Sequence, residues 1–204
     1  MSRNAETEAK FIIPNPQIFA AIQTLDRLGQ FQLEPLSTQT VVDHYVDTAD
    51  KLVFQANYAC RIRDGETKKK LTLKSLTAAT SHIHARLEIE AIITGDTPAE
   101  WADSEAKRTL FEIIQTEPIQ PWFTIYQTRQ KFAVLHDEQQ LMELSLDAVA
   151  HQAGPIVDYY ELEAELTDLG TEANLLAFVT ALQQKWSLQP QPKSKFERAL
   201  ALNQ

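Results

Sequence analysis

Charged residues recur at spacings of two or four along six segments of the sequence, and this pattern constrains the fold more than any other feature. Successive side chains of a β-strand point to opposite faces of the sheet, so these residues share a face. Like charges in such a row lie about 7 Å apart, which destabilises a strand unless opposite charges or ions compensate. The six rows are Glu6/Glu8/Lys10, Arg61/Arg63, Arg86/Glu88/Glu90, Arg129/Lys131, Glu143/Asp147 and Glu161/Glu163/Glu165.

Apolar residues occupy the alternate positions of several of these segments, as Phe11 and Ile13 or Leu144 and Leu146 do. A solvated sheet face would explain one such strand, but solvated faces usually mix uncharged polar residues with charged ones. Over six segments the pattern predicts a sheet whose charged faces turn inward. That interior would hold eight basic residues (Lys10, Arg61, Arg63, Lys74, Arg86, Arg129, Lys131 and Lys195) and nine acidic ones (Glu6, Glu8, Glu88, Glu90, Glu143, Asp147, Glu161, Glu163 and Glu165).

An interior of this kind has to bind charged partners, because buried charges are tolerated only when they are paired, hydrated or bound to a ligand. The basic residues suit a polyanion, since arginine binds phosphate oxygens in pairs and lysine supplies a point charge. The acidic residues suit divalent cations, and a ligand set made only of oxygen selects hard ions such as Mg²⁺ or Mn²⁺.

The predicted elements favour an antiparallel α+β fold, because most strands follow one another through short turns. Turns are expected at Asp64-Gly65, Asp137-Glu138 and Ala153-Gly154-Pro155. No GxGxxG or GxxxxGK[ST] motif is present, so neither nucleotide-binding loop is available. The expected strands span about 6–13, 39–47, 57–63, 67–77, 82–94, 122–136, 139–150 and 157–167, and the expected helices about 16–29, 98–115 and 170–185.

Length and charge narrow the functional classes. A chain of 204 residues predicts one domain over residues 1–204, and the net charge of −9 disfavours nucleic acid and anionic lipid as partners. The single cysteine, Cys60, excludes an internal disulfide and favours a reducing compartment. No apolar run approaches the ~20 residues of a membrane span. We therefore expect a cytoplasmic protein with no membrane partner.

At its charged motifs the sequence resembles the CYTH superfamily, the triphosphate tunnel metalloenzymes named for class IV adenylyl cyclase and thiamine triphosphatase. Cys60 departs from the pattern, since the family usually has leucine before RxR. The resemblance implies a closed eight-stranded antiparallel β-barrel flanked by helices. It rests on Glu6-Thr7-Glu8-Ala9-Lys10 (ExExK), Tyr45-Val46-Asp47-Thr48 with Leu52, Arg61-Ile62-Arg63 (RxR), Lys74, Arg86-Leu87-Glu88-Ile89-Glu90 (RxExE), Arg129 with Lys131, Glu143 with Asp147, Glu161 to Glu165 (ExExE), and Ser194-Lys195-Phe196 with Arg198.

The resemblance also implies roles for single residues. The substrate-binding residues would be Lys10, Arg61, Arg63, Lys74, Arg86, Arg129, Lys131 and Lys195. The metal ligands would come from Glu6, Glu8, Glu88, Glu90, Asp147, Glu161, Glu163 and Glu165, with Glu6, Glu8 and Glu165 at one ion and Glu90, Asp147 and Glu163 at a second. The catalytic residues would be Glu8, Lys74, Glu90 and Glu163.

The closing Ser194-Lys195-Phe196 with Arg198 most resembles the bacterial inorganic triphosphatases of the family. The favoured function is therefore metal-dependent hydrolysis of a small-molecule triphosphate, inorganic triphosphate, to diphosphate and phosphate. The alternatives are a class IV adenylyl cyclase making cyclic AMP and diphosphate from ATP, a thiamine triphosphatase, and a non-catalytic module that binds polyphosphate or nucleotide. Family members often pair as homodimers, but the sequence leaves the oligomeric state open.

Overall fold

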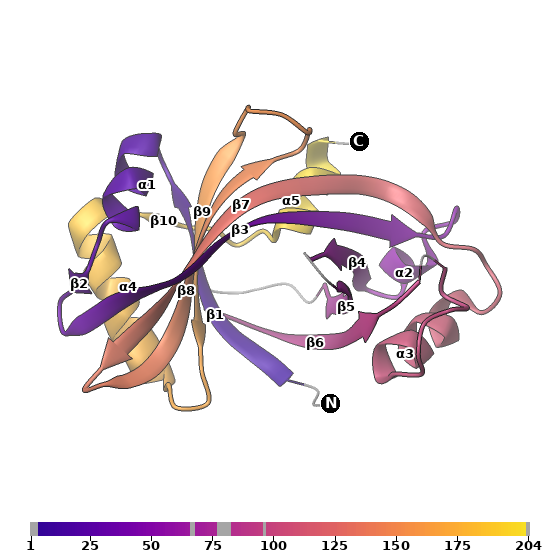
Figure 1. Ribbon diagram of the computed structural model, residues 1–204, viewed down its shortest axis with the longest axis horizontal. Helices are drawn as coiled ribbons and strands as arrows, with labels where there is room; N and C mark the ends of the chain where they lie inside the picture. Colours follow the sequence, from indigo (N-terminus) through magenta and orange to yellow (C-terminus); the bar gives the residue numbers. More distant parts are fainter. Residues whose placement is uncertain (1–3, 66–67, 77–82, 96, 203–204) are drawn as a thin grey trace.

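The structure is a computed structural model that describes residues 4–65, 68–76, 83–95 and 97–202. Its longest strands, β3 and β7, run side by side along most of the molecule (Figure 1). The strands are β1 (Asn4–Ile13), β2 (Arg27–Leu28), β3 (Phe31–Asp47), β4 (Tyr58–Asp64), β5 (Lys69–Ser75), β6 (Ile83–Ile93), β7 (Gln120–His136), β8 (Gln139–Ala150), β9 (Tyr159–Leu166) and β10 (Gln189–Pro190). The helices are α1 (Pro16–Gln23), α2 (Leu52–Gln55), α3 (Glu105–Ile114), α4 (Glu172–Trp186) and α5 (Lys195–Leu202).

All strand pairs of the described chain are antiparallel, which confirms the antiparallel α+β prediction. The neighbour order is β10-β1-β6-β5-β4-β3-β7-β8-β9, with β2 beside β3 and one additional pairing between β1 and β9. The sheet thus has ten strands in an open order, whereas the sequence predicts eight in a closed barrel. The number of strands differs because β2 and β10 have two residues each, which is too short for a hydrophobic periodicity to predict them.

Strand β1 connects the two ends of this order because its two halves pair differently. Residues 4–9 pair with β6, and residues 8–13 pair with β9. The second register sets Glu8 opposite Glu165 and Lys10 opposite Glu163. Charged rows from both ends of the sheet are therefore brought together at β1.

Local signals explain where the helices begin and end. Helix α1 starts as predicted, with the Asn15 carboxamide accepting a hydrogen bond from the Ile18 amide, but it stops at residue 23 rather than 29. Gly29, at φ +57°, follows β2 and allows the tight turn into β3. Helix α3 begins at 105 rather than 98 because Ser104 caps it. Helix α4 matches its prediction, and α5 was predicted only as a closing motif.

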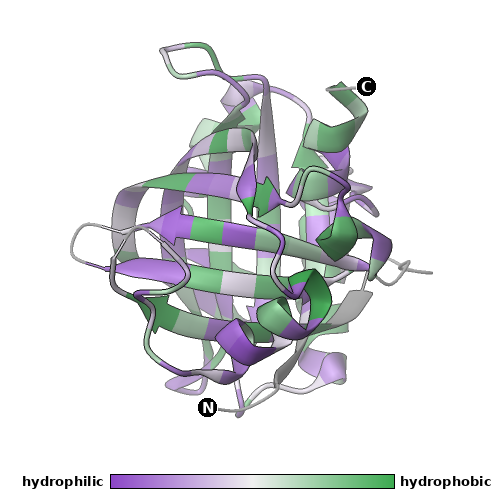
Figure 2. Ribbon diagram, turned by 90° about the vertical axis from the view of Figure 1, so that its right-hand side faces the viewer, coloured by the Kyte–Doolittle hydropathy of each residue, from purple (hydrophilic) through white to green (hydrophobic). Residues whose placement is uncertain are grey.

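The apolar faces of the strands pack outward against helices. Phe11 of β1 and Leu162 of β9 share a core with Phe178 of α4, while Leu71 of β5 shares a second core with Leu110 of α3. Figure 2 shows the resulting alternation of hydrophilic and hydrophobic residues along the strands. The charged faces are left to turn inward, as the parity of the sequence predicts. Among the described residues, no helix is long and apolar enough to cross a membrane.

Candidate active site

The inward faces of the strands enclose a cavity of about 310 Å³. Seven of the eight predicted substrate-binding residues line it, and the side chain of the eighth, Arg86, lies outside the described part of the chain, as does that of Glu6. Lys70 adds a further cation to the wall. The lining residues are Glu8, Lys10, Tyr45, Arg61, Arg63, Lys70, Lys74, Glu88, Glu90, Arg129, Lys131, Glu143, Glu163, Glu165, Ser194 and Lys195.

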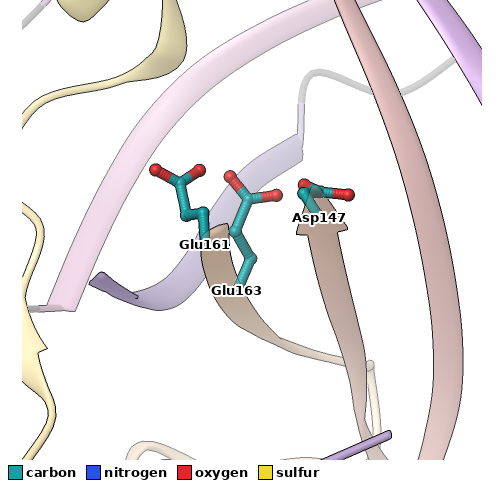
Figure 3. Close-up of side chains that lie close together, drawn as sticks. All are labelled: Asp147, Glu161 and Glu163. Atoms are coloured by element: carbon teal, nitrogen blue, oxygen red, sulfur yellow. The ribbon is translucent and has the colours of Figure 1, made fainter. Parts of the chain in front are cut away.

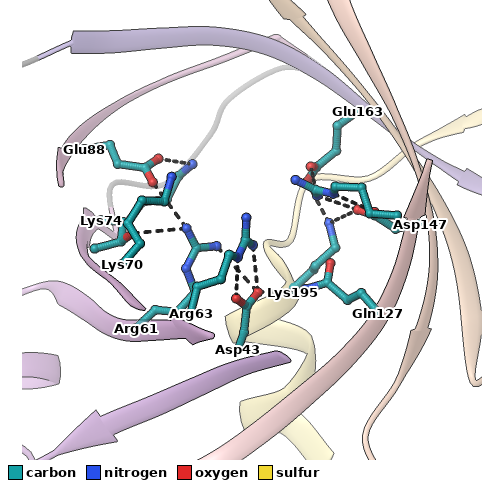
Figure 4. A network of polar contacts seen from close by, with 12 residues as sticks. Asp43, Arg61, Arg63, Lys70, Lys74, Glu88, Gln127, Asp147, Glu163 and Lys195 are labelled. Atoms are coloured by element: carbon teal, nitrogen blue, oxygen red, sulfur yellow. Dashed lines mark hydrogen bonds and ion pairs between the residues drawn. The ribbon is translucent and has the colours of Figure 1, made fainter. Parts of the chain in front are cut away.

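Two arginines of β4 form part of this wall, and both bind Asp43 of β3 (Figure 4). Arg63 donates from Nε to Asp43 Oδ1 at 2.6 Å and from Nη2 to Oδ2 at 2.9 Å, and Gln127 Nε2 donates to Oδ2 at 2.7 Å. Arg61 Nη1 lies 3.6 Å from Oδ2. Burial alone would raise the pKa of Asp43, but the charge of Arg61 and the hydrogen bonds from Arg63 hold it well below its usual range.

Lysines of β5 and β7 pair with carboxylates on neighbouring strands. Lys74 Nζ lies 2.8 Å from Glu88 Oε2, and Lys70 Nζ lies 2.7 Å from Glu90 Oε1. Lys131 Nζ lies 2.6 Å from Glu143 Oε1. The strand register sets Lys74 directly opposite Glu88, whereas Lys70 and Lys131 each reach a carboxylate two positions along the neighbouring strand. Cations and anions are interleaved around the cavity rather than separated into two halves.

A compact acidic cluster of Asp147, Glu161 and Glu163 lies on β8 and β9 (Figure 3). One carboxylate oxygen from each residue lies within 4.8 Å of those of the other two. Lys195 Nζ contacts all three residues, at 3.0 Å from Asp147 Oδ2 and 2.8 Å from Glu163 Oε1, with Glu161 as the third partner. Arg129 also binds Asp147 through two hydrogen bonds, of 2.7 Å and 2.6 Å. Lys10 adds a third contact, at 3.1 Å from Glu163 Oε1, so the cluster is held by three cations of the protein.

The acidic cluster contains carboxyl groups with opposite pKa shifts. Burial raises the pKa of Glu161 to about 7, with the neighbouring charge of Glu163 adding to the rise and Lys195 opposing it. For Glu163, burial acts in the same direction, but Lys10 and Lys195 outweigh it and hold the pKa well below its usual range. The Oε2 atom of Glu161 is buried and has no hydrogen-bond partner among the described residues.

A second group of carboxylates lies where β1 meets β9. Lys10 Nζ lies 3.2 Å from Glu8 Oε1 and 3.1 Å from Glu163 Oε1. Glu165 has no ion-pair partner within the described chain. Burial and the charges of Glu8 and Glu163 raise its pKa to about 7. A divalent cation bound here would relieve this repulsion.

The carboxylate oxygens of both groups form a donor set that suits a hard divalent cation. The structure brings Asp147 and Glu163 together, as the predicted second ion site requires. Glu90 binds Lys70 and Thr72 instead and is not part of that cluster. The structure adds Glu161 to the cluster, and Glu8 and Glu165 are opposite one another in the strand register.

Comparison with known proteins identifies the family. The model of the CYTH domain family matches residues 4–200. The chain belongs to the CYTH domain family.

Solved structures support the CYTH fold of the chain. A protein from Hippeastrum, named as a candidate adenylyl cyclase and described as revealing a dominant triphosphatase activity, is 19% identical over 96% of this chain and 95% of its own, with a TM-score of 0.76. A protein from Bacillus halodurans, named as a candidate adenylate cyclase, is 20% identical over 97% of this chain and 98% of its own, with a TM-score of 0.65. A protein from Pyrococcus horikoshii is 19% identical over 97% of this chain and 99% of its own, with a TM-score of 0.61. None of the curated proteins matches the chain.

Sequence reasoning missed two polar residues of this CYTH site. Asp43 and Gln127 are both buried and both lie beside the arginines of the wall. Asp43 shares its strand face with Tyr45, which lines the cavity, and that shared parity was the available signal. No charged residue lies two positions from Asp43 on either side, since Val41 and Tyr45 occupy those positions, and this hides its membership of the charged interior.

Proposed function

We propose that this CYTH protein hydrolyses inorganic triphosphate to diphosphate and phosphate, with Mg²⁺ or Mn²⁺ as its cofactor and the chain acting as one domain. The observation that carries the proposal is the cavity, whose wall combines eight lysine and arginine side chains with six glutamates. A triphosphate needs several cations along its length, and a simple anion-binding module would gain little from so many carboxylates. The pairing of β1 with both β6 and β9 supports a wall that surrounds the substrate as a tunnel.

The basic side chains would bind the phosphates and hold them in line for attack by water. Arg61, Arg63 and Lys131 lie on β4 and β7, while Lys10 and Lys195 reach in from β1 and α5. Phosphoryl transfer depends mainly on positioning and on neutralising charge, and it requires no covalent enzyme intermediate. The terminal phosphorus would take the water oxygen while its bond to the bridging oxygen breaks, releasing diphosphate.

The carboxylates fit a divalent cation. Glu8 and Glu165 would hold one ion where β1 meets β9, because Glu165 has a raised pKa and repels its neighbours. The cluster of Asp147, Glu161 and Glu163 would provide a second metal site, since Oε2 of Glu161 is buried there without a hydrogen-bond partner among the described residues. Such an ion, when bound, neutralises phosphate charge and lowers the pKa of coordinated water.

The substrate is tested by incubating the pure protein with inorganic triphosphate, ATP or thiamine triphosphate, with Mg²⁺, with Mn²⁺ and with a chelator. Phosphate, diphosphate and cyclic AMP are measured together. We expect metal-dependent release of phosphate and diphosphate from inorganic triphosphate. Cyclic AMP from ATP would assign the site to a cyclase, and binding of all three without turnover would leave a binding module.

The metal sites are tested with Glu8→Gln and Glu163→Gln, which keep side-chain size and remove one charge each. We expect both to abolish metal-dependent turnover while the far-ultraviolet circular dichroism stays unchanged. Glu112→Gln, on the exposed face of α3, is the matched control and should retain full activity. Turnover retained in both site variants would overturn the assignment of these carboxylates.

A further inference from the structure

Asp43 holds two cavity arginines without being part of the cavity wall. Its side chain is buried, with 0% of the residue exposed, and it is absent from the lining. Arg63 and Arg61, which it contacts, both line the cavity. Asp43 therefore points toward the interior, as Tyr45 does, but lies beneath the two arginines, which separate it from the cavity.

The strand registers build this arrangement. Asp43 of β3 is opposite Arg63 of β4 on one side and Ile125 of β7 on the other, and Gln127 reaches it from β7. Both carboxylate oxygens of Asp43 are occupied, Oδ1 by Arg63 Nε and Oδ2 by Arg63 Nη2 and Gln127 Nε2. This contact fixes the plane of the guanidinium group, because two parallel hydrogen bonds define its orientation.

The same contact leaves one edge of Arg63 available. Its Nε and Nη2 atoms point at Asp43, and Nη1 has no hydrogen bond within the described chain. Because Arg63 lines the cavity, this remaining donor is the one that a ligand can use. Arg61 is held on several sides, since Nη2 donates to Thr72 Oγ1 at 3.2 Å and to Glu88 Oε1 at 3.5 Å, while Nη1 lies 3.6 Å from Asp43 Oδ2.

We propose that Asp43 is a positioning residue for substrate: from beneath the cavity wall it orients Arg63 so that the free Nη1 donor meets the phosphate chain, and it holds Arg61 in place beside Arg63. The inference rests on the proposed function, because it assumes that the cavity binds a triphosphate. The low pKa of Asp43 agrees with it, since the carboxylate stays charged throughout the neutral range.

Two effects of removing the Asp43 charge have opposite signs, which makes the role testable. Asp43→Asn removes one negative charge from the cavity region, so electrostatics alone predicts tighter binding of an anion. The asparagine amide also turns N–H groups toward one nitrogen of Arg63, so the paired contact is lost and the guanidinium is no longer held. Positioning therefore predicts weaker binding.

The experiment measures binding of inorganic tripolyphosphate by titration calorimetry, in the presence of a chelator. For Asp43→Asn we expect affinity to fall about tenfold or more, the usual effect of losing a charge-assisted hydrogen bond. Asp64→Asn is the matched control, because Asp64 follows Arg63 on β4, is 43% exposed and pairs with His44 outside the cavity. We expect it to bind as the wild type does. Affinity of Asp43→Asn that equals or exceeds the wild type would overturn the proposal.

A second variant shows that Asp43 acts through Arg63. Arg63→Lys keeps the charge but cannot make the paired contact, so we expect a similar loss of affinity and little further loss in the double variant with Asp43→Asn. Losses that multiply in the double variant would mean that Asp43 acts only on the general fold. Should Asp43→Asn not fold, wild-type affinity in Arg63→Lys alone would overturn the proposal.

Failure of the proposed function gives a different result from failure of this inference. A wild-type protein that neither hydrolyses tripolyphosphate nor binds it, with Mg²⁺ or with a chelator, refutes the function and with it the inference. A wild-type protein that binds it, together with an Asp43→Asn variant that binds equally well, refutes only the role of Asp43.

Discussion

The clearest energetic prediction concerns Glu165, a carboxyl group that the fold keeps among other carboxyl groups. Its pKa is raised from 4.5 to about 7 by burial and by the charges of Glu8 and Glu163. A carboxyl whose pKa is higher in the folded state binds more protons there, so its contribution to stability falls as pH rises from 4.5 through 7. A rise of that size means that ionised Glu165 lowers the free energy of unfolding by about 3 kcal/mol at pH 8.

Replacing Glu165 by glutamine removes this cost because glutamine stays neutral at every pH. In the presence of a chelator, we expect Glu165→Gln to raise the free energy of unfolding at pH 8 by up to about 3 kcal/mol and to leave it nearly unchanged at pH 4.5. Urea unfolding followed by tryptophan fluorescence at both pH values measures the difference. Added Mg²⁺ should stabilise the wild type more than the variant, since the variant lacks one ligand.

Glu143→Gln is the control for this experiment. Glu143 is opposite Glu165 in the strand register, but it pairs with Lys131 at 2.6 Å and its side chain is 31% exposed. Neutralising it should therefore cost about 1 kcal/mol or less rather than stabilise the protein. The reasoning is refuted if Glu165→Gln is no more stable than the wild type at pH 8, or if its gain is the same at both pH values.

Two further substitutions and one labelling experiment test the packing of buried polar groups. Lys195→Met leaves the acidic cluster without its ammonium group, and urea unfolding at pH 7 should show a loss of about 3 kcal/mol in the free energy of unfolding. Asp47→Ala removes the carboxylate that accepts hydrogen bonds from the backbone amides of Thr48 and, in α2, of Val53 and Phe54, so thermal unfolding should show a loss of about 2 kcal/mol in the free energy of unfolding. Burial raises the pKa of Cys60 to about 12, so the thiol should react with a disulfide reagent at pH 8 only when the protein unfolds, and rapid labelling of the native protein would contradict its burial.

The fold could be predicted from the sequence where alternation is regular. The predicted strand 139–150 matches β8, and the other long strands match within a few residues except β3, which extends from 31 rather than 39. Residues 34–40 of β3 are exposed, so the sequence there carries no apolar alternation. Asp137 and Glu138, both at positive φ, form the predicted turn between β7 and β8 without any glycine.

The site could be predicted in outline because charge parity determines which side chains face inward. The partners of those side chains could not, since they depend on which strands are neighbours. Lys195 binds Asp147, Glu161 and Glu163 only because the fold brings the first residue of α5 beside β8 and β9, and no local pattern encodes that position. The contacts of Asp47 are local by contrast, because its carboxylate accepts hydrogen bonds from α2, only a few residues along the chain.

The ion pairs of the cavity couple the binding of metal to the binding of triphosphate. Seven of the eight basic side chains of the wall contact a carboxylate of the wall or of the acidic cluster, so a phosphate has to take these donors from an internal competitor. A divalent cation that binds the carboxylates releases the same donors. Metal and triphosphate should consequently raise each other's affinity by the same factor, as thermodynamic reciprocity requires, even where no atom of one touches the other.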